Sequence, residues 1–302
     1  MNVLNLLKII RFHIVVGGFL AFSLGVLLAI VGGGSFNLTS FVLGYVVVFL
    51  ADLSTHYGND YFDVEVDKYV EKKKFFSGSG ILVNNPDLRS LSKIISLALL
   101  TCSIIFATIT VVFFGFQIEF FIVILGASLV GWFYSAPPIR LISRGFGEIA
   151  VALVTGFAIP GLGYLAIRGQ FDPLFFHFVI PFILYGLTLS LSLHAPDVEV
   201  DKVADKRNLT VRLGQRRTFL LILTLVTLAT IIFSIYAFQN TFLVVNFGVI
   251  VLFSVIPFVA GLVSFAGFFQ KEVNYLSMLN VAALFVFNMT MIMYLLSIVL
   301  AA

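Results

Sequence analysis

The sequence predicts an all-α membrane protein with about nine transmembrane helices and two pseudo-equivalent halves. Hydrophobic residues make up 60% of its 302 residues and charged residues only 11%, a balance that excludes a soluble domain of this length. The apolar residues form about nine runs, and a helix needs roughly 20 such residues to cross the bilayer. Strands of a membrane barrel are about half as long, so the runs predict helices. The sequence Asp-Val-Glu-Val-Asp-Lys occurs at residues 63–68 and again at 197–202, which predicts the two halves.

The expected helices follow one another along a single transmembrane domain, residues 1–302. They lie near residues 13–32, 37–58, 90–113, 116–134, 146–167, 173–194, 218–238, 242–265 and 276–300. The first run is too long for the core of a signal peptide, and the Gly-Gly-Gly-Ser after it is not a convincing cleavage site, so we expect a retained helix. The third run holds the single cysteine, Cys102, interpreted as a small apolar residue. Pro137 and Pro138 end the fourth helix.

The basic residues predict the orientation. With nine spans, the N-terminus and the loops after the second, fourth, sixth and eighth helices share one side of the membrane. These segments hold all 18 Lys and Arg residues except Arg168, and the positive-inside rule makes that side cytoplasmic. We therefore expect a multi-pass protein of the cell membrane with an active site on the cytoplasmic face.

The two acidic motifs, at residues 59–71 after the second helix and 197–207 after the sixth, predict a metal site. Each copy places acids at i, i+4 and i+8, which on a helix form one row on one face. The rows are Asp63, Asp67 and Glu71, and Asp197, Asp201 and Asp205. Such rows repel unless cations lie between them, and Mg²⁺ prefers carboxylate oxygens shared with substrate phosphates. The pattern predicts a composite Mg²⁺–diphosphate site; the alternative is two solvated helix ends left by a duplication.

Further residues are assigned around these rows. Asn59 lies one turn before Asp63 and adds a neutral oxygen ligand, whereas Asp60, Glu65 and Glu199 are expected off the rows. We expect the aromatic face of Tyr134 to stabilise a carbocation. The expected diphosphate-binding residues are Arg11, Asn59, Lys68, Lys72, Arg140, Lys202 and Lys206. For several of the lysines the alternative is attraction to lipid headgroups.

Three polar residues within or beside the spans have two interpretations each. Asp52 lies midway along the second helix, where a buried acid is costly and usually functional. It could bind the polar group of an acceptor or pair inside the bundle. His56 and His194 could each act as a base, although a role in helix packing is favoured for both.

These residues resemble the UbiA superfamily of intramembrane aromatic prenyltransferases. Residues 59–67 read Asn-Asp-Tyr-Phe-Asp-Val-Glu-Val-Asp and match the pattern N-D-x-x-D-x-x-x-D, and residues 206–214 are similar to the family's stretch after its second motif. The resemblance covers the whole chain and implies a UbiA-like bundle. It also implies that two Mg²⁺ ions and a diphosphate are held by Asn59, Asp63, Asp67, Asp197 and Asp201.

The chain departs from the family pattern at two places. Pro138 stands where a Tyr-x-x-x-Lys element has its lysine, so Arg140 is taken as the substitute, and Arg11 is followed by Phe12 where many members have proline. Residues 59–63 and 144–148 look most like the menaquinone-type branch that acts on dihydroxynaphthoate. Residues 134–138 and the second acidic motif also resemble the chlorophyll-synthase and archaeal glyceryl-phosphate branches, so the acceptor stays open.

The resemblance implies transfer of an isoprenyl group from an allylic polyprenyl diphosphate to a lipophilic, aromatic quinone-precursor acceptor in the membrane. Transfer to a glyceryl phosphate or chlorophyll-type acceptor is the alternative. A cation-coupled transporter should carry its acids near the bilayer midplane, and a CDP-alcohol phosphotransferase should carry D-G-x-x-A-R, which is absent after Asp63 and Asp197. Neither nucleic acid nor an obligate protein partner is expected.

Overall fold

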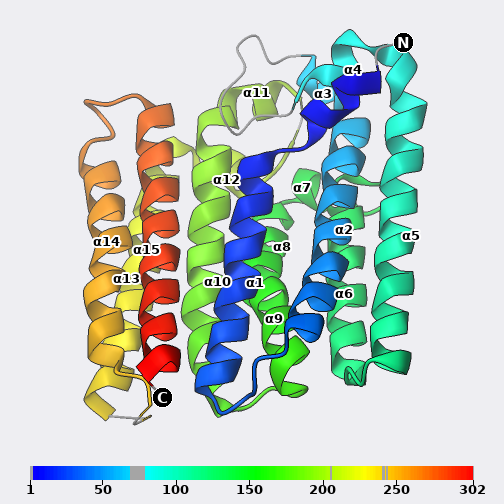
Figure 1. The fold of residues 1–302 in the computed structure, drawn as a ribbon. Helices are drawn as coiled ribbons and strands as arrows, with labels where there is room; N and C mark the ends of the chain where they lie inside the picture. The colour runs from blue at the N-terminus through cyan, green and yellow to red at the C-terminus, as the bar shows by residue number, and fades with distance from the viewer. Residues whose placement is uncertain (1–2, 69–78, 205, 240–241, 243, 302) are drawn as a thin grey trace.

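The chain forms an upright bundle of helices (Figure 1). The structure, a computed structural model, describes residues 3–68, 79–204, 206–239, 242 and 244–301, and no strand occurs in these ranges. Within them, nine segments are long and apolar enough to cross a membrane. The predicted all-α fold with about nine spans is therefore confirmed.

The spans correspond closely to the predicted runs. Eight are the helices α1 (Phe12–Val31), α2 (Leu38–Phe62), α5 (Arg89–Phe113), α6 (Ile118–Ser135), α10 (Pro173–His194), α13 (Gln215–Gln239), α14 (Phe247–Ala266) and α15 (Val273–Ala301). The fifth span joins α8 (Gly147–Leu153), the π-helical turn η3 (Val154–Ala158) and α9 (Ile159–Arg168). The short elements are η1 (Val3–Ile9), α3 (Val64–Asp67), α4 (Ile81–Asn84), η2 (Pro86–Leu88), α7 (Leu141–Arg144), η4 (Ala195–Asp197), α11 (Val198–Val203) and α12 (Leu209–Leu213).

Local sequence features set the ends of several spans. Asn37 begins α2 because its side chain accepts a hydrogen bond from the backbone N–H of Ser40. Asp172 does the same for α10, which continues with Pro173 at the first helical position. Gly169 ends α9 with φ of 76°, a backbone conformation that glycine adopts without steric cost. The spans are thus bounded by caps as well as by hydropathy.

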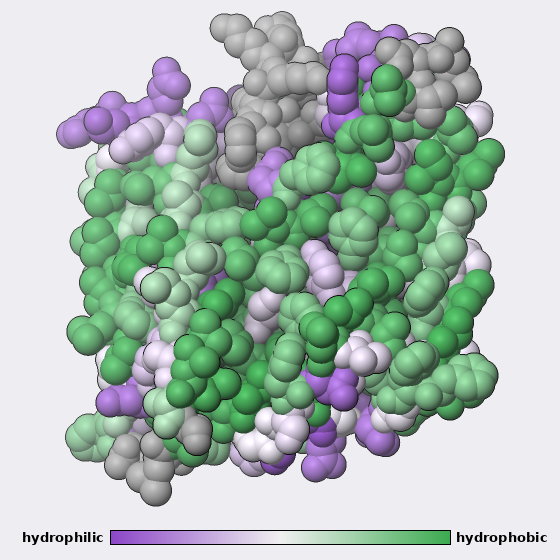
Figure 2. All heavy atoms as spheres, viewed as in Figure 1, coloured by the Kyte–Doolittle hydropathy of each residue, from purple (hydrophilic) through white to green (hydrophobic). Residues whose placement is uncertain are grey.

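The outer surface of the bundle is apolar between two polar ends (Figure 2). Large side chains such as Phe113 and Phe238 point away from the protein, 76% and 93% exposed. In water this surface would be unfavourable, but lipid solvates it, while the helices satisfy their backbone hydrogen bonds internally. The apolar composition is therefore explained by a lipid environment, and the protein is a multi-pass membrane protein.

The elements that carry the acidic motifs lie at one end of the bundle. Figure 1 shows α3, α4 and α11 beside the N-terminus at this end, and the C-terminus at the other. Inside the bundle, α2 packs against α5, α1 against α9 and α15, and α10 against α13. A cavity enclosed mainly by α1, α2, the fifth span, α10 and α15, with part of α6, opens toward the motifs.

Candidate active site

Both acidic motifs line the same cavity. It holds about 400 Å³ of space, which is within the usual range of small-molecule pockets, roughly 300–1,000 Å³. The charged and hydrogen-bonding residues around its mouth are Arg11, Asn59, Asp60, Asp63, Asp67, Tyr134, His194, Asp197, Asp201 and Lys206. Deeper in the bundle the lining becomes apolar and aromatic, with Phe182, Leu189 and Phe287. The cavity thus joins a charged mouth to an apolar interior.

The expectation that each motif is one continuous helix is wrong. α2 ends at Phe62 and α3 begins at Val64, with Asp63 between them at φ −95° and ψ 5°. Asp197, the last residue of η4, has the same conformation directly before α11, at φ −95° and ψ 3°. Asn59, Asp63 and Asp67 nevertheless all reach the cavity, because the break does not interrupt the bond from Asp67 N–H to the Asp63 carbonyl at 2.9 Å. The matching breaks show that the two copies share a backbone conformation.

The Asp63 carboxylate is only half satisfied. Its Oδ2 accepts a hydrogen bond from the Ser135 hydroxyl at 3.1 Å, while its buried Oδ1 has no partner among the described residues. A buried carboxylate oxygen without a donor is costly. This oxygen is therefore available for a cation.

Asp67 lies where negative charge accumulates. Burial, followed by the carboxylates of Asp60 and Asp63, raises the pKa of Asp67 to about 7, against the opposing effect of Arg11. Three acids with few counter-charges favour binding of a divalent cation, which would stabilise the ionised form.

Asp201 is oriented by a buried chain of hydrogen bonds. Asn208 Nδ2 donates to Asp201 Oδ2 at 2.7 Å, and the Thr210 hydroxyl donates to Asn208 Oδ1 at 2.9 Å. The backbone N–H of Thr210 donates to Glu148 Oε1 at 3.1 Å. Asn208, Thr210 and Glu148 are all 0% exposed. No role was assigned to these three residues from the sequence. The one local signal is that Asn208 is a typical helix N-cap residue, which begins α12.

Lys206 pairs with an acid of the second motif. Its Nζ lies 3.5 Å from Asp201 Oδ1, and the side chain is 11% exposed. Burial lowers the pKa of Lys206, but the carboxylates of Asp63, Asp201 and Asp67 outweigh it, and the net shift is upward. Lys206 is therefore a fixed positive charge inside the acidic mouth.

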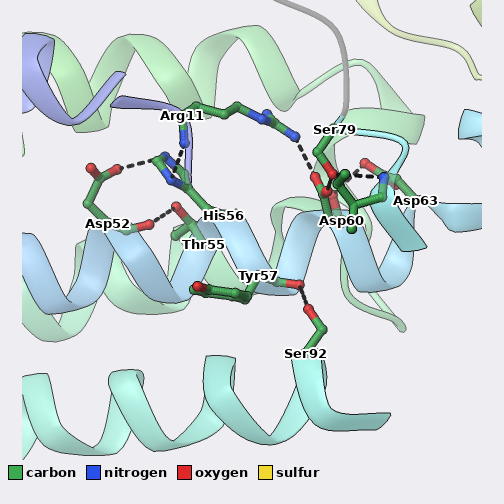
Figure 3. Close-up of polar contacts among 11 residues, drawn as sticks. Arg11, Asp52, Thr55, His56, Tyr57, Asp60, Asp63, Ser79 and Ser92 are labelled. Atoms are coloured by element: carbon green, nitrogen blue, oxygen red, sulfur yellow. Dashed lines mark hydrogen bonds and ion pairs between the residues drawn. The ribbon is translucent and has the colours of Figure 1, made fainter. Parts of the chain in front are cut away.

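Arg11 and Asp60 close the mouth on the side of the first motif. Arg11 Nη2 lies 2.5 Å from Asp60 Oδ1, and the Ser79 hydroxyl donates to Asp60 Oδ2 (Figure 3). Asp60, which was expected off the row of metal ligands, is 2% exposed and lines the cavity beside that row. The reason is tertiary: the N-terminal segment and the residues before α4 come in beside α2 and turn this face inward. Arg11 is brought to the site as predicted.

Tyr134 faces the cavity with its hydroxyl held in place. The hydroxyl lies 3.1 Å from His194 Nε2, and His194 Nδ1 lies 2.8 Å from the Ser190 carbonyl oxygen. Because a carbonyl only accepts, Nδ1 carries the proton of the neutral ring, and Nε2 accepts from Tyr134. His194 thus orients Tyr134, and its Nε2 is occupied by the hydrogen bond from the Tyr134 hydroxyl.

Several predicted diphosphate ligands do not line the cavity. Lys68 pairs with Glu65 at 2.5 Å and Lys202 with Glu199 at 2.9 Å, all of them side chains exposed to solvent. The i,i+3 spacing lets each glutamate capture the following lysine on the outer surface. Arg140 lies in the turn before α7, away from the cavity lining. Lys72, Glu71 and Asp205 are outside the described residues.

The donor set fits a divalent cation that shares its ligands with a substrate. In the described ranges no three His, Cys, Asp or Glu side chains converge closely enough to hold a metal ion by themselves. Mg²⁺ characteristically takes one or two carboxylates and completes its shell with water and phosphate oxygens. The unpartnered Asp63 oxygen and the neighbouring Asp67 and Asn59 supply such ligands on one side, and Asp197 and Asp201 on the other.

Comparisons with known proteins agree with this architecture. Residues 19–274 match the UbiA prenyltransferase family. A UbiA homologue from Archaeoglobus fulgidus bound to DMAPP and Mg²⁺ is similar with a TM-score of 0.72, 18% identity, and coverage of 98% of this chain and 100% of the other. An apo UbiA homologue from Aeropyrum pernix K1 is similar with a TM-score of 0.67 and 13% identity. The match covers 89% of this chain and 94% of the other.

A structure described for digeranylgeranylglyceryl phosphate synthase in membranes is also similar. Its TM-score is 0.67 and its identity 17%, with 98% of this chain and 96% of the other covered. No curated protein sequence matches the chain. At these identities the structural likeness establishes a shared fold.

Proposed function

The chain belongs to the UbiA prenyltransferase family, and on that premise we propose that it transfers an isoprenyl group from an allylic polyprenyl diphosphate to a lipophilic aromatic acceptor, with Mg²⁺ as cofactor. It is an intramembrane prenyltransferase, and its family fixes the reaction class. The metal, the acceptor class and the roles of single residues are the proposed parts.

One observation carries the proposal. The acids of both motifs, a buried lysine and an arginine line the charged mouth of a cavity whose interior is apolar. An isoprenyl diphosphate has the same division, with a charged head and an apolar tail. Burial of each CH₂ group of the tail contributes about 0.8 kcal/mol, so the tail favours the interior while the head stays among the acids and bases.

We assign the metal site to Asn59, Asp63, Asp67, Asp197 and Asp201, all of which line the mouth. Bound there, Mg²⁺ would neutralise the charge that develops on the leaving diphosphate. The solved homologue from Archaeoglobus fulgidus binds DMAPP and Mg²⁺, which supports the same pairing here.

The other residues act on the substrate directly. Lys206 and Arg11 donate to the diphosphate oxygens, because both are charged and already face the acids of the mouth. The Tyr134 ring, fixed through His194, faces the allylic carbon and stabilises positive charge on it. The apolar lining excludes water, which would otherwise react with that carbon.

The proposed side of the reaction follows from charge. The mouth lies at the end of the bundle that holds nearly all the basic residues, and that end is cytoplasmic by the positive-inside rule. The direct test is purified protein incubated with DMAPP, longer allylic diphosphates and a panel of acceptors, namely dihydroxynaphthoate, hydroxybenzoate and geranylgeranylglyceryl phosphate. Prenylation of an aromatic acceptor is the expected result.

Removal of the metal should stop the reaction reversibly. Treatment with EDTA is expected to reduce transfer to background, and added Mg²⁺ should restore it, because the acids cannot neutralise a diphosphate on their own. Release of diphosphate measures the effect. Full turnover in EDTA-treated protein would contradict the metal assignment.

Asn208→Leu should weaken the second half of the metal site. Leucine removes the donor to Asp201 Oδ2 and the acceptor for the Thr210 hydroxyl, and loss of such outer hydrogen bonds costs about 10–100-fold in metal affinity or activity. The Mg²⁺ concentration for half-maximal rate should rise correspondingly. Asn84→Leu, at an exposed asparagine of α4, is the control and should leave it unchanged.

A further inference from the structure

Asp52 is a carboxyl group inside the membrane that the proposed mechanism does not use. It lies midway along α2 and lines the main cavity, together with Thr55 and His56. It precedes Asn59 by seven residues, which is two helical turns, so both side chains face the cavity about 10 Å apart along the axis. Asp52 is therefore placed below the metal site, where a second substrate would lie.

The Asp52 carboxyl makes no side-chain hydrogen bond with the described residues and has only a long contact with His56. The nearest candidate is His56 Nε2, which lies 3.6 Å from Asp52 Oδ1, beyond hydrogen-bond distance (Figure 3). His56 Nδ1 accepts from the backbone N–H of Arg11 at 3.4 Å. A neutral His56 therefore carries its proton on Nε2, facing Asp52. A carboxyl at this depth with only this long contact, and 19% exposed to the cavity, is suited to a ligand that donates a hydrogen bond to it.

Space is kept open beside the carboxyl. A Cβ on Gly18 of α1 would lie 3.9 Å from Asp52 Oδ2, and one on Gly17 would touch the Phe285 ring at 3.7 Å. On its other side Asp52 borders a smaller pocket, shared with Ala51, Ala127, Ser128, Gly131 and Trp132. The small residues among them, with Gly17 and Gly18, leave space beside Asp52 between α1, α2 and α6.

The chemistry of Asp52 selects between the two substrates. An isoprenoid tail has no hydrogen-bond donor and would leave the carboxyl unsatisfied, whereas the wall formed by Phe182, Leu189 and Phe287 suits it. An anionic group would be repelled by Asp52 and attracted by Arg11 at the mouth. A hydroxyl group satisfies the carboxyl directly.

We propose that Asp52 binds a hydroxyl group of the acceptor, so that the acceptor is a hydroxyl-bearing molecule with its reactive carbon toward Asn59 and Tyr134. This inference rests on the proposed function and deepens it. A site built around a hydroxyl donor discriminates strongly against an analogue that lacks it, because the carboxyl then stays unpaired. Asp52 is thus a specificity-determining residue.

Binding tests the proposal independently of turnover. The probes are dihydroxynaphthoate, hydroxybenzoate and geranylgeranylglyceryl phosphate, each with its O-methyl ether. Affinity is measured from the rise in the thermal unfolding midpoint of the purified protein with Mg²⁺ and a non-reactive thiodiphosphate analogue of the prenyl donor. At least one hydroxyl probe should bind wild type about tenfold more tightly than its ether.

Substitutions test whether Asp52 causes the preference for the hydroxyl probe over its ether. Asp52→Leu should abolish the preference for the hydroxyl probe, Asp52→Asn should retain part of it because an amide oxygen still accepts, and Gly18→Leu should block both probes. All three should keep their affinity for the thiodiphosphate analogue. The matched controls are Glu119→Gln, an exposed acid of α6, and Gly126→Leu, at a glycine with open space beside it; both should resemble wild type.

Several outcomes overturn the inference. One is that wild type binds no hydroxyl probe better than its ether, and another is that Asp52→Leu retains the preference. Loss of thiodiphosphate binding in Asp52→Asn, with wild-type stability, would place Asp52 in the donor site instead. A wild-type protein that shows the preference but transfers no prenyl group would refute the proposed function and leave the hydroxyl site standing.

Discussion

Asp63→Asn and Asp197→Asn are each expected to abolish prenyl transfer while leaving the protein folded. The two residues occupy the matching breaks before α3 and α11, with the same backbone angles to within 2°. Asparagine keeps the shape but removes a negative charge and a ligand oxygen. Metal ions contribute several kcal/mol of transition-state stabilisation, so kcat/KM should fall at least about a thousandfold for either variant.

Glu65→Gln and Glu199→Gln are the matched controls within the same two motifs. Both side chains are exposed, at 69% and 75%, and both form ion pairs with basic residues on the outer surface. Exposed ion pairs of this kind contribute little, so turnover should stay within about twofold of wild type. Rates at saturating Mg²⁺, with unfolding midpoints measured in parallel, decide the comparison. Near-normal turnover in Asp63→Asn or Asp197→Asn would contradict the composite site.

The spans were predictable because the bilayer imposes a simple length rule. Roughly 20 apolar residues are needed to cross it, and all nine predicted runs became spanning segments within the described residues. The meeting of α2 and α10 at one cavity followed from the duplicated motif. Both features were predictable because each appears in the sequence as a repeated pattern, the apolar runs in one case and the acidic motif in the other.

The details of the site were not predictable because they depend on tertiary approach. Helical spacing placed Asp60 off the row of metal ligands but did not predict its partner; the N-terminal segment folds beside α2 and pairs Asp60 with Arg11. Lys68 and Lys202 looked suited to a diphosphate, yet local ion pairs hold them outside. The hydrogen bonds that orient Asp201 extend through Thr210 to Glu148, which lies 62 residues before Thr210 in the sequence. No local sequence pattern predicts a contact over that separation.

The same limit applies to the glycines, of which the chain has 24. Two of them lie where α1 and α9 touch directly. A Cβ built on Gly25 of α1 would overlap the backbone carbonyl oxygen of Pro160 in α9, and one on Gly163 of α9 would overlap that of Phe22 in α1. Small residues are what allow membrane helices to approach this closely. The contact holds the central helix α1 against the fifth span, and both border the cavity.

Gly25→Ala is therefore expected to have the largest effect on stability of any single methyl group added to the chain. The obstacle is backbone, which cannot rotate away, so α1 and α9 must separate; overpacking of this kind costs at least about 3 kcal/mol. The unfolding midpoint and the yield of folded protein should fall sharply, whereas Gly126→Ala, with no atom near its Cβ, should leave both unchanged. Gly163→Ala should resemble Gly25→Ala.

Because a single separation of α1 from α9 relieves both overlaps, the double variant should lose less stability than the sum of the two single variants. Strict additivity would show that the two glycines do not share one contact, and a wild-type midpoint for Gly25→Ala would refute the close approach of α1 and α9.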